Sequence, residues 1–279
     1  MAKKNPKKCC PETKLLKNWL EMNDPLAIAT HQDVDADATF SAALLHTLRP
    51  NAAVVFLRVD AEVTAKEVIA VDMMTGPRAV KGLNVGSAFG LIVATIHQSH
   101  PLLFKALKPW AKQLNLTDQA KPCYDNVVLA DLVNAWKAAG LNDREILDQA
   151  VLILEGKWKV AKRRAQQTNR AKAISIKNRV AVLGKDDHVR AKDMFKLGAL
   201  AVVRESEQGL SVVLSKKAKQ KGVRLNVLQE KLDDGWFFHP DGWLASFGGP
   251  KTPKNPEEAG VSVKVLTQCA KMLVAEVKQ

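Results

Sequence analysis

A short apolar run that leads into a histidine and three acidic residues constrains the fold of this chain more than any other segment. Residues 26–30 read Leu-Ala-Ile-Ala-Thr, the composition of a strand, and residues 31–37 continue as His-Gln-Asp-Val-Asp-Ala-Asp. Residues 38–48 then have the composition of a helix. A strand, a polar loop and a helix in this order predict the start of a parallel α/β layer.

Further apolar segments extend this pattern. Residues 52–59 predict a second strand, and residues 67–72 predict a third strand that ends on the carboxylate of Asp72. Residues 12–22 predict a short amphipathic helix, and helical patterns alternate with loops as far as about residue 170. We therefore expect an α/β domain with a parallel sheet over residues 1–168.

The remainder of the chain has a different pattern. Residues 199–205 and 210–215 predict a hairpin, and residues 236–249 predict a second hairpin that turns at Asp241-Gly242. Helices are predicted over residues 224–232 and, after Pro256, over residues 257–277. Residues 169–279 are therefore predicted to form a smaller α+β domain.

Length and composition exclude some classes of protein. The chain has 279 residues, of which 47% are hydrophobic, but its apolar runs are far shorter than the roughly 20 residues of a membrane span. The first ten residues are basic and lack the apolar segment of a secretory signal, so a cytoplasmic protein without a membrane partner is expected. The four cysteines are interpreted as free thiols, with metal binding by Cys9 and Cys10 as an alternative.

The net charge favours a polyanionic partner. Lysine and arginine outnumber the acids to give a formal charge of +13 and a pI near 9.6. Phosphates attract such a surface, because binding releases their counterions. Residues 157–179 carry nine of these cations and predict either a helix that faces phosphates or a solvated connecting helix. A solubilising surface is the alternative for the charge as a whole, and the oligomeric state stays open.

The loop after the first strand has the residue types of a metal site. His31, Asp35 and Asp37 lie where open α/β sheets bind ligands, and Asp72 ends another strand of the same layer. Imidazole and carboxylates are suitable ligands for Mn²⁺ or Mg²⁺, which can clamp a phosphoryl group and activate water. The alternative is that Asp35 and Asp37 cap the next helix. The alternating acids 33, 35 and 37 would repel one another without a cation, which favours metal.

These residues resemble the first motif of the DHH phosphoesterase superfamily, which has the spacing His-x-x-x-Asp-x-Asp followed by a small residue and a serine. His31, Asp35, Asp37 and Ser41 stand in the matching places. Asp72, within Ala-Val-Asp-Met, resembles the aspartate of the second motif. Residues 84–93 are similar to the helix start after the third motif, and residues 238–252 to the glycine-rich substrate segment of the Myg branch, a group of exonuclease-like metal hydrolases.

The resemblance implies a set of metal ligands. His31, Asp35 and Asp72 would hold one ion, and Asp37 with bridging Asp72 would hold half of a second. The acid of the fourth motif would be Asp131, with Asp125 as a competitor and a buried cap as the alternative. The Asp-His-His of the third motif is missing, because residues 73–85 contain no histidine and no acid. His97 and His100 are candidate substitutes, although they follow the apolar pattern of a helix.

The second domain would then hold the substrate. Gly248 and Gly249 would let the backbone approach a phosphate, with Lys251 and His239 as donors or charges. The alternative is a simple Gly-Gly bend between a strand and the last helix.

Three functions follow from this sequence. The first is a metal-dependent phosphodiester hydrolase, either exonuclease-like or a nucleotide phosphodiesterase, that acts on short RNA, DNA or a nucleotide through Asp35, Asp37 and Asp72. The alternative is a catalytically degenerate DHH-like protein that binds nucleic acid or nucleotide, as the missing third motif indicates. A third is a structural part of a ribonucleoprotein, suggested by the basic residues 1–8.

Overall fold

The computed structural model describes residues 10–122, 128–232, 234–275 and 277. The chain divides into two compact units, residues 1–162 and 163–279, and each is described by itself. The division falls within helix α6 (Asp143–Ala171), which also contains residue 168, the boundary expected from the sequence.

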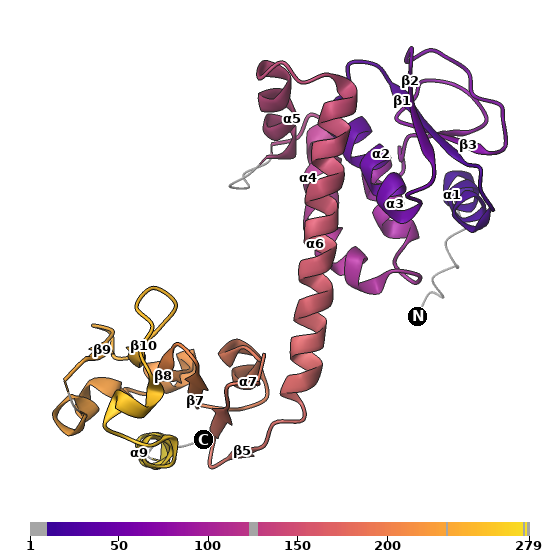
Figure 1. Cartoon of the computed structure of the whole chain (residues 1–279). Helices are drawn as coiled ribbons and strands as arrows, with labels where there is room; N and C mark the ends of the chain where they lie inside the picture. The colour runs from indigo at the N-terminus through magenta and orange to yellow at the C-terminus, as the bar shows by residue number, and fades with distance from the viewer. Residues whose placement is uncertain (1–9, 123–127, 233, 276, 278–279) are drawn as a thin grey trace. The chain divides into compact units, whose positions relative to one another are not determined.

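The first unit is built on a parallel four-stranded sheet in the order β2-β1-β3-β4 (Figure 1). Its strands are β1 (Ala27–His31), β2 (Ala53–Leu57), β3 (Val68–Val71) and β4 (Ala79–Val80). In the register, Ala27 pairs with Ala53 on one side and with Val68 on the other. The chain therefore runs from β1 to β2 on one side and then crosses to β3 on the other side of β1. The gap between β1 and β3 is a topological switch point.

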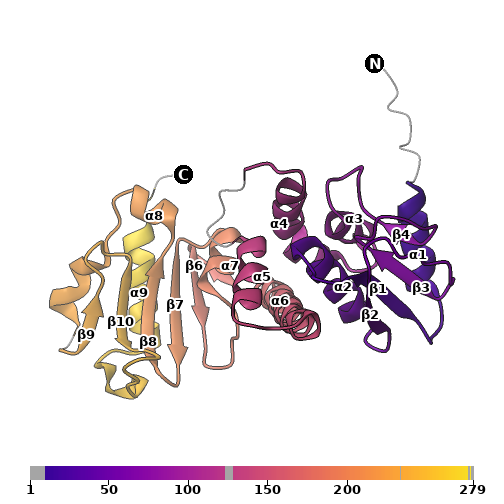
Figure 2. The same ribbon diagram turned by 90° about the horizontal axis from the view of Figure 1, so that it is seen from above.

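Side chains alternate across this sheet and build two cores. Ile28 and Ile69 point into the large core with Phe40 of α2 and Phe89 of α3, whereas Ala29 and Ala70 belong to a small cluster on the other face. Helices α2 and α3 therefore cover one face of the sheet, as Figure 2 shows. The helices of this unit are α1 (Pro11–Glu21), α2 (Ala36–Leu48), α3 (Ala88–Thr95), α4 (Pro101–Asp118), α5 (Leu129–Ala138) and the first part of α6.

The second unit contains a six-stranded sheet in the order β5-β6-β7-β8-β10-β9, in which only β6 and β7 pair in parallel. Val203 points into a core that α9 completes, and Val202 points to the opposite face with Met194 of α7. The elements are β5 (Ile176–Lys177), β6 (Val180–Leu183), α7 (Ala191–Lys196), β7 (Ala201–Ser206), β8 (Gly209–Leu214), α8 (Lys216–Gln220), η1 (Leu225–Lys231), β9 (Trp236–Phe238), β10 (Leu244–Gly248), η2 (Pro256–Ala259) and α9 (Val263–Ala275).

The predicted α/β class with a parallel first sheet is confirmed. Two local predictions differ from the structure. The segment 224–232 forms the 3-10 helix η1 rather than an α-helix. The single helix predicted over 257–277 is divided into η2 and α9, because Gly260 adopts a left-handed φ of 68° that ends the first of them.

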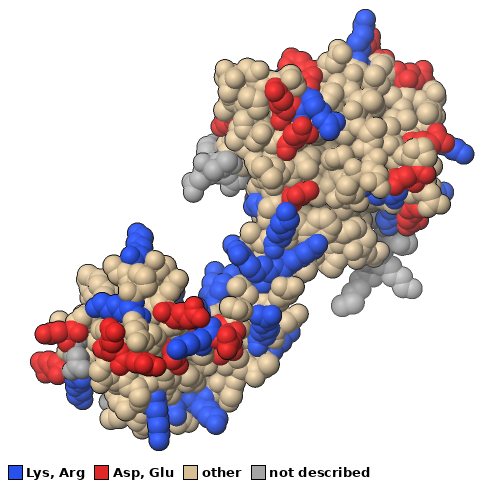
Figure 3. Space-filling model, viewed as in Figure 1, with Lys and Arg blue, Asp and Glu red and all other residues tan. Residues whose placement is uncertain are grey.

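Two further predictions concern membranes and thiols. Among the described residues, no helix has the length and apolar content needed to cross a bilayer. Cys10 and Cys269 are free thiols, whereas Cys9 and Cys123 lie outside the described residues. In Figure 3, lysine and arginine side chains gather along the C-terminal half of α6.

Candidate metal centre

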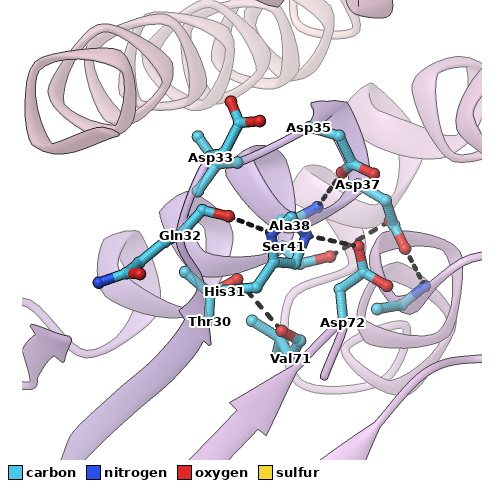
Figure 4. A network of polar contacts seen from close by, with 12 residues as sticks. Thr30, His31, Gln32, Asp33, Asp35, Asp37, Ala38, Ser41, Val71 and Asp72 are labelled. Carbon is cyan, nitrogen blue, oxygen red and sulfur yellow. Dashed lines mark hydrogen bonds and ion pairs between the residues drawn. The ribbon is translucent and has the colours of Figure 1, made fainter. Parts of the chain in front are cut away.

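Three of the predicted ligands meet at the switch point of the first sheet. His31 is the last residue of β1, Asp72 directly follows β3, and Asp35 is the N-cap of α2. Each offers one ligand atom, and these atoms all lie within 4.8 Å of one another. Because the carboxyl ends of β1 and β3 are adjacent, side chains from two distant segments converge on one point (Figure 4).

The imidazole of His31 is oriented for ligation. Its Nδ1 lies 2.8 Å from the carbonyl oxygen of Gln32, so Nδ1–H is the donor and, in the neutral ring, Nε2 carries the lone pair. Nε2 lies 3.5 Å from Oδ2 of Asp72. The hydrogen bond to Asp72 raises the pKa of His31 to about 9, against the opposing effect of burial. A metal-bound histidine needs the same arrangement, with its second nitrogen held by a backbone carbonyl.

Asp35 and Asp72 hold their places through the backbone. Asp72 adopts a left-handed φ of 54°, which is uncommon for residues other than glycine but tolerated by aspartate, and its N–H donates to Val80 O. Oδ1 of Asp35 accepts from Ala38 N at 2.9 Å, so this residue does cap α2. Burial and the charge of Asp72 raise the pKa of Asp35. The capping and ligand roles are compatible, because a carboxylate has two oxygens.

Asp37 lies close by but outside this cluster of ligand atoms. Its side chain is buried, with Oδ2 accepting from Ala88 N at 2.7 Å and Oδ1 from Phe89 N at 2.9 Å. Ser41 Oγ also donates to Oδ1, at 3.4 Å. Burial and the charge of Asp72 raise the pKa of Asp37 to about 8. In the structure, Asp37 therefore anchors the N-terminus of α3.

The remaining predicted acids lie elsewhere. Asp33 points away from the cluster and forms an ion pair with Lys137 at 2.5 Å, while its side chain is 90% exposed. Asp131 is exposed in the first turn of α5 and is not a member of the cluster. Asp125 falls outside the described residues. His97 and His100 pack against Phe104 and Trp158 and do not join the cluster either.

Asp118, the last residue of α4, is an exposed acid that the sequence did not single out. Partial loss of water around its carboxyl, together with the charges of Asp72 and Asp35, raises its pKa. In the sequence, Asp118 is only the last residue of a predicted helix. The acids that affect its pKa lie more than 40 residues away, so no local spacing indicates the interaction.

The next strand of the sheet explains the missing third motif. β4 ends at Val80 and is followed by Lys81, Gly82 and Leu83, so the carboxyl end beside Asp72 carries no acid and no histidine. Glu12 of α1 accepts hydrogen bonds from the backbone N–H groups of Lys81 and Gly82, at 2.8 and 3.3 Å. A Cβ at Gly82 would lie 1.8 Å from Ser87 O, so this tight turn requires glycine.

The donor set fits one divalent cation. One nitrogen and two carboxylates suit Mn²⁺ or Mg²⁺. Metal–ligand bonds of about 2.1 Å separate neighbouring ligand atoms by about 3 Å and opposite ones by about 4.2 Å. The observed spread of 4.8 Å therefore needs only a small side-chain shift. Within the described part of the chain, this is the one group of three or more histidine, cysteine or acidic ligands that could hold an ion.

The predicted substrate residues of the second unit separate into two places. His239 follows β9 and its N–H donates to Leu244 O, at the start of β10, whereas Gly248 ends β10. A strand of this length separates the two by about 13 Å. Gly249 N donates to Thr252 O at 3.0 Å, so that amide is already bonded within a turn that includes the exposed Lys251.

Gly248 has a structural reason to be glycine. Its φ is 78°, and a Cβ there would lie 2.5 Å from Gln208 O of the neighbouring hairpin. Close packing of the β8 and β10 ends thus accounts for this residue without a ligand, in agreement with the Gly-Gly bend.

Comparison with known proteins gives only distant likeness. No family model and no curated protein matches the chain. It is similar to RecJ from Thermus thermophilus in complex with Mg²⁺, at 15% identity over 97% of this chain and 53% of that one, with a TM-score of 0.30. A pGpG-specific phosphodiesterase, PggH from Vibrio cholerae, is 11% identical over 90% of this chain and 99% of that one, with a TM-score of 0.34.

A DHH domain from a member of a family of ribosomal proteins is 12% identical over 96% of this chain and 91% of that one, at a TM-score of 0.32. This chain spans about half of the RecJ chain. The solved structures to which this chain is similar thus include RecJ, a phosphodiesterase and a DHH domain, and the likeness is one of fold.

Proposed function

We propose that this protein is a metal-dependent phosphoester hydrolase that acts on short nucleic acid or a nucleotide. The observation that carries the proposal is the convergence of His31, Asp35 and Asp72 within 4.8 Å at the switch point of a parallel sheet. Mn²⁺ or Mg²⁺ is the ion that these ligands suit best.

The electrostatics of the site support a cation. The negative charge of Asp72 contributes to the raised pKa of Asp35, Asp37 and Asp118. The charge of Asp72 therefore disfavours the ionised form of three other carboxyl groups, two at the start of α2 and one at the end of α4, which costs free energy in the folded protein. A divalent ion between them reverses the sign of this effect, because it favours the ionised form of each carboxyl.

The residues of the site would have separate roles. An ion held by these residues would polarise a phosphoryl oxygen and lower the pKa of water. The carbonyl of Gln32 fixes the ring of His31, so Nε2 rather than Nδ1 would be available to hold it. Asp37 fixes the start of α3 beside Asp72, and Asp118 adds a further carboxyl at the rim. The net charge of +13 supports a phosphate-rich substrate.

Turnover of short RNA, DNA and a dinucleotide with Mn²⁺ tests this function. We expect Asp35→Asn and Asp72→Asn to lower kcat/KM by about a hundredfold or more, since each removes a charged ligand. Asp33→Asn is the matched control, because Asp33 is two residues from Asp35 and points away to Lys137. Equal turnover in the wild type and in both ligand variants would contradict the proposal.

The second candidate function is a binding module without turnover. Its supporting observation is the turn after β4, where Lys81, Gly82 and Leu83 leave no ligand for a second ion. The same assay separates the two functions. Oligonucleotide binding by the wild-type protein, with no hydrolysis in Mn²⁺ or Mg²⁺, would favour the module.

A further inference from the structure

The second unit has a basic cavity that the sequence analysis did not identify. Its volume is about 680 Å³, and among the described residues five cationic side chains and no carboxylate line it. The cations are Arg179, Lys192, Lys196, Lys216 and Lys217.

The sheet fixes the floor of this cavity. Arg179 immediately precedes β6, Leu200 precedes β7 and Ser215 follows β8, so all three stand in one row at the same end of the sheet. Leu200 N donates to Arg179 O at 2.6 Å, and Ser215 N donates to Leu200 O at 2.8 Å. The cavity is therefore built on paired strands, and α7 and α8 supply its lysines.

This end of the sheet is opposite to the glycine segment. β8 runs from Gly209 to Leu214, and Gly209 pairs with Gly248 while Leu214 leads into Ser215. Six residues of strand place the two ends about 17 Å apart. The predicted phosphate site at Gly248 and Gly249 and the basic cavity are thus separate places.

Across the ranges that the structure describes, the lysines of the cavity form no ion pair, although the hydrogen bonds from Arg190 and, less strongly, the charge of Lys196 lower the pKa of Asp193 on α7. Lys192, Lys196, Lys216 and Lys217 are exposed, and none forms an ion pair within the described part of the chain. The acid on α7, Asp193, is 1% exposed and accepts two hydrogen bonds from Arg190, at 2.7 and 2.9 Å. Cations gathered in one cavity repel one another, and an anionic ligand relieves that repulsion.

The apolar part of the cavity lining further limits the class of ligand. Phe195 of α7 is half-buried and lines the cavity together with Leu200. Aromatic side chains beside a track of lysines are typical of proteins that bind single strands, because bases stack on the ring while phosphates contact the cations. The volume matches that of a small-molecule pocket and is too small to enclose a duplex.

We propose that this cavity binds single-stranded nucleic acid, with backbone phosphates on the lysines of α7 and α8 and a base against Phe195. The substrate class rests on the proposed function, but the binding itself needs no metal ion. The second unit would then hold the strand through this end of its sheet rather than through the glycine turn.

Fluorescence anisotropy of a labelled single-stranded 12-mer, with the full chain in EDTA, tests the proposal. At about 100 mM salt, we expect Lys192→Gln/Lys196→Gln and Lys216→Gln/Lys217→Gln each to weaken binding about tenfold. Each pair should also lower the slope of log K against log salt by about 1.4, since a single strand gives about 0.7 per phosphate contact. The matched control is Lys231→Gln/Lys264→Gln, which removes the same charge from exposed lysines outside the cavity.

Phe195→Leu keeps an apolar side chain and removes the stacking surface. It should weaken binding at least about fivefold without changing the salt slope. Thermal melting shows whether each variant is folded. Equal loss of affinity for the 12-mer in the control pair and in the cavity pairs would overturn the proposal. It would also be overturned if the cavity pairs lost binding to phosphatidylserine vesicles but bound the 12-mer as the wild type does.

Measurement in EDTA makes this result independent of the hydrolase proposal, because the cavity includes none of the residues of the candidate metal centre. Weaker binding of the 12-mer by the cavity pairs, with no turnover by the wild type or by any variant, would uphold the cavity and defeat the hydrolase. Turnover, together with equal affinity for the 12-mer in the wild type and in the cavity pairs, would uphold the hydrolase and defeat the cavity.

Discussion

At the scale of single residues, His31 connects the backbone of β1 to the chemistry of the site. Its Nδ1 is held by Gln32 O and its Nε2 faces Asp72, so the ring can either carry a proton or bind an ion at the same atom. Proton and metal therefore compete for Nε2, and the metal-free protein should depend on pH in a way that the loaded protein does not.

The pH dependence has a definite sign. The folded pKa of His31 is about 9, above its ordinary value of 6.5, so its protonated form stabilises the fold. That contribution is present in full below pH 6.5 and is lost as the pH rises through about 9. We expect His31→Asn to be less stable than the wild type in EDTA by about 2 kcal/mol at pH 6, and nearly equal to it at pH 9.5. Urea unfolding at both pH values measures this difference.

Asp37 does not disturb that comparison. Its raised pKa of about 8 produces a penalty that grows between about pH 4 and pH 8, but both proteins carry it. A stability difference that stays constant from pH 6 to pH 9.5 would contradict the assigned role of His31.

At the scale of elements, the N-terminus of α3 is fastened to the site by a carboxylate from another helix. Asp37 accepts the N–H groups of Ala88 and Phe89, and Ser87 caps the same helix at Gly90 N. Removing the carboxyl leaves two buried N–H groups without acceptors. We therefore expect Asp37→Ala to lower the free energy of unfolding in EDTA by about 3 kcal/mol.

Asp35→Ala provides the matched comparison. Asp35 caps α2 chiefly through its bond to Ala38 N, so its loss should cost about 1 kcal/mol. Urea unfolding of the two variants at pH 7 measures the difference. A larger loss for Asp35→Ala than for Asp37→Ala would show that the two acids have been assigned the wrong roles.

The elements also show what the sequence could predict. Residues 26–29 and 68–71 are continuous apolar runs that lead to His31 and Asp72, so both strands and the meeting of their ends followed from local pattern and parallel pairing. β4 has only two residues, Ala79 and Val80, and is too short to produce a periodic signal.

Long-range contacts limited the prediction of the site. The partners of Asp37 are 51 and 52 residues away along the chain, and no local spacing distinguishes an anchor of α3 from a metal ligand. Asp118 was missed for the same reason. In the second unit, the motif drew attention to Gly248 and Gly249, whereas the lysines of the cavity come from two short helices with no motif.

At the scale of the whole molecule, the two proposed activities belong to different units. Residues 1–162 contain the acidic metal centre, and residues 163–279 contain the basic cavity. Ligands that bind only the folded state stabilise the part of the chain that they contact. Each ligand should therefore protect a different set of backbone amides from hydrogen exchange.

Hydrogen exchange on the full chain tests this separation. Mn²⁺ should slow exchange in residues 28–38 and 68–90, which surround the metal centre, and leave residues 190–220 unchanged. A single-stranded 12-mer in EDTA should slow exchange in residues 190–220 and leave the first set unchanged. Protection of the first set by the 12-mer in EDTA would contradict the assignment of binding to the cavity.

Calorimetric titration with Mn²⁺ at pH 7.5 tests whether His31, Asp35 and Asp72 together hold a divalent cation. We expect one ion per chain, at least tenfold weaker binding in Asp72→Asn, and unchanged binding in Asp33→Asn. Absence of Mn²⁺ binding in the wild type, or equal affinity in the wild type and Asp72→Asn, would contradict it.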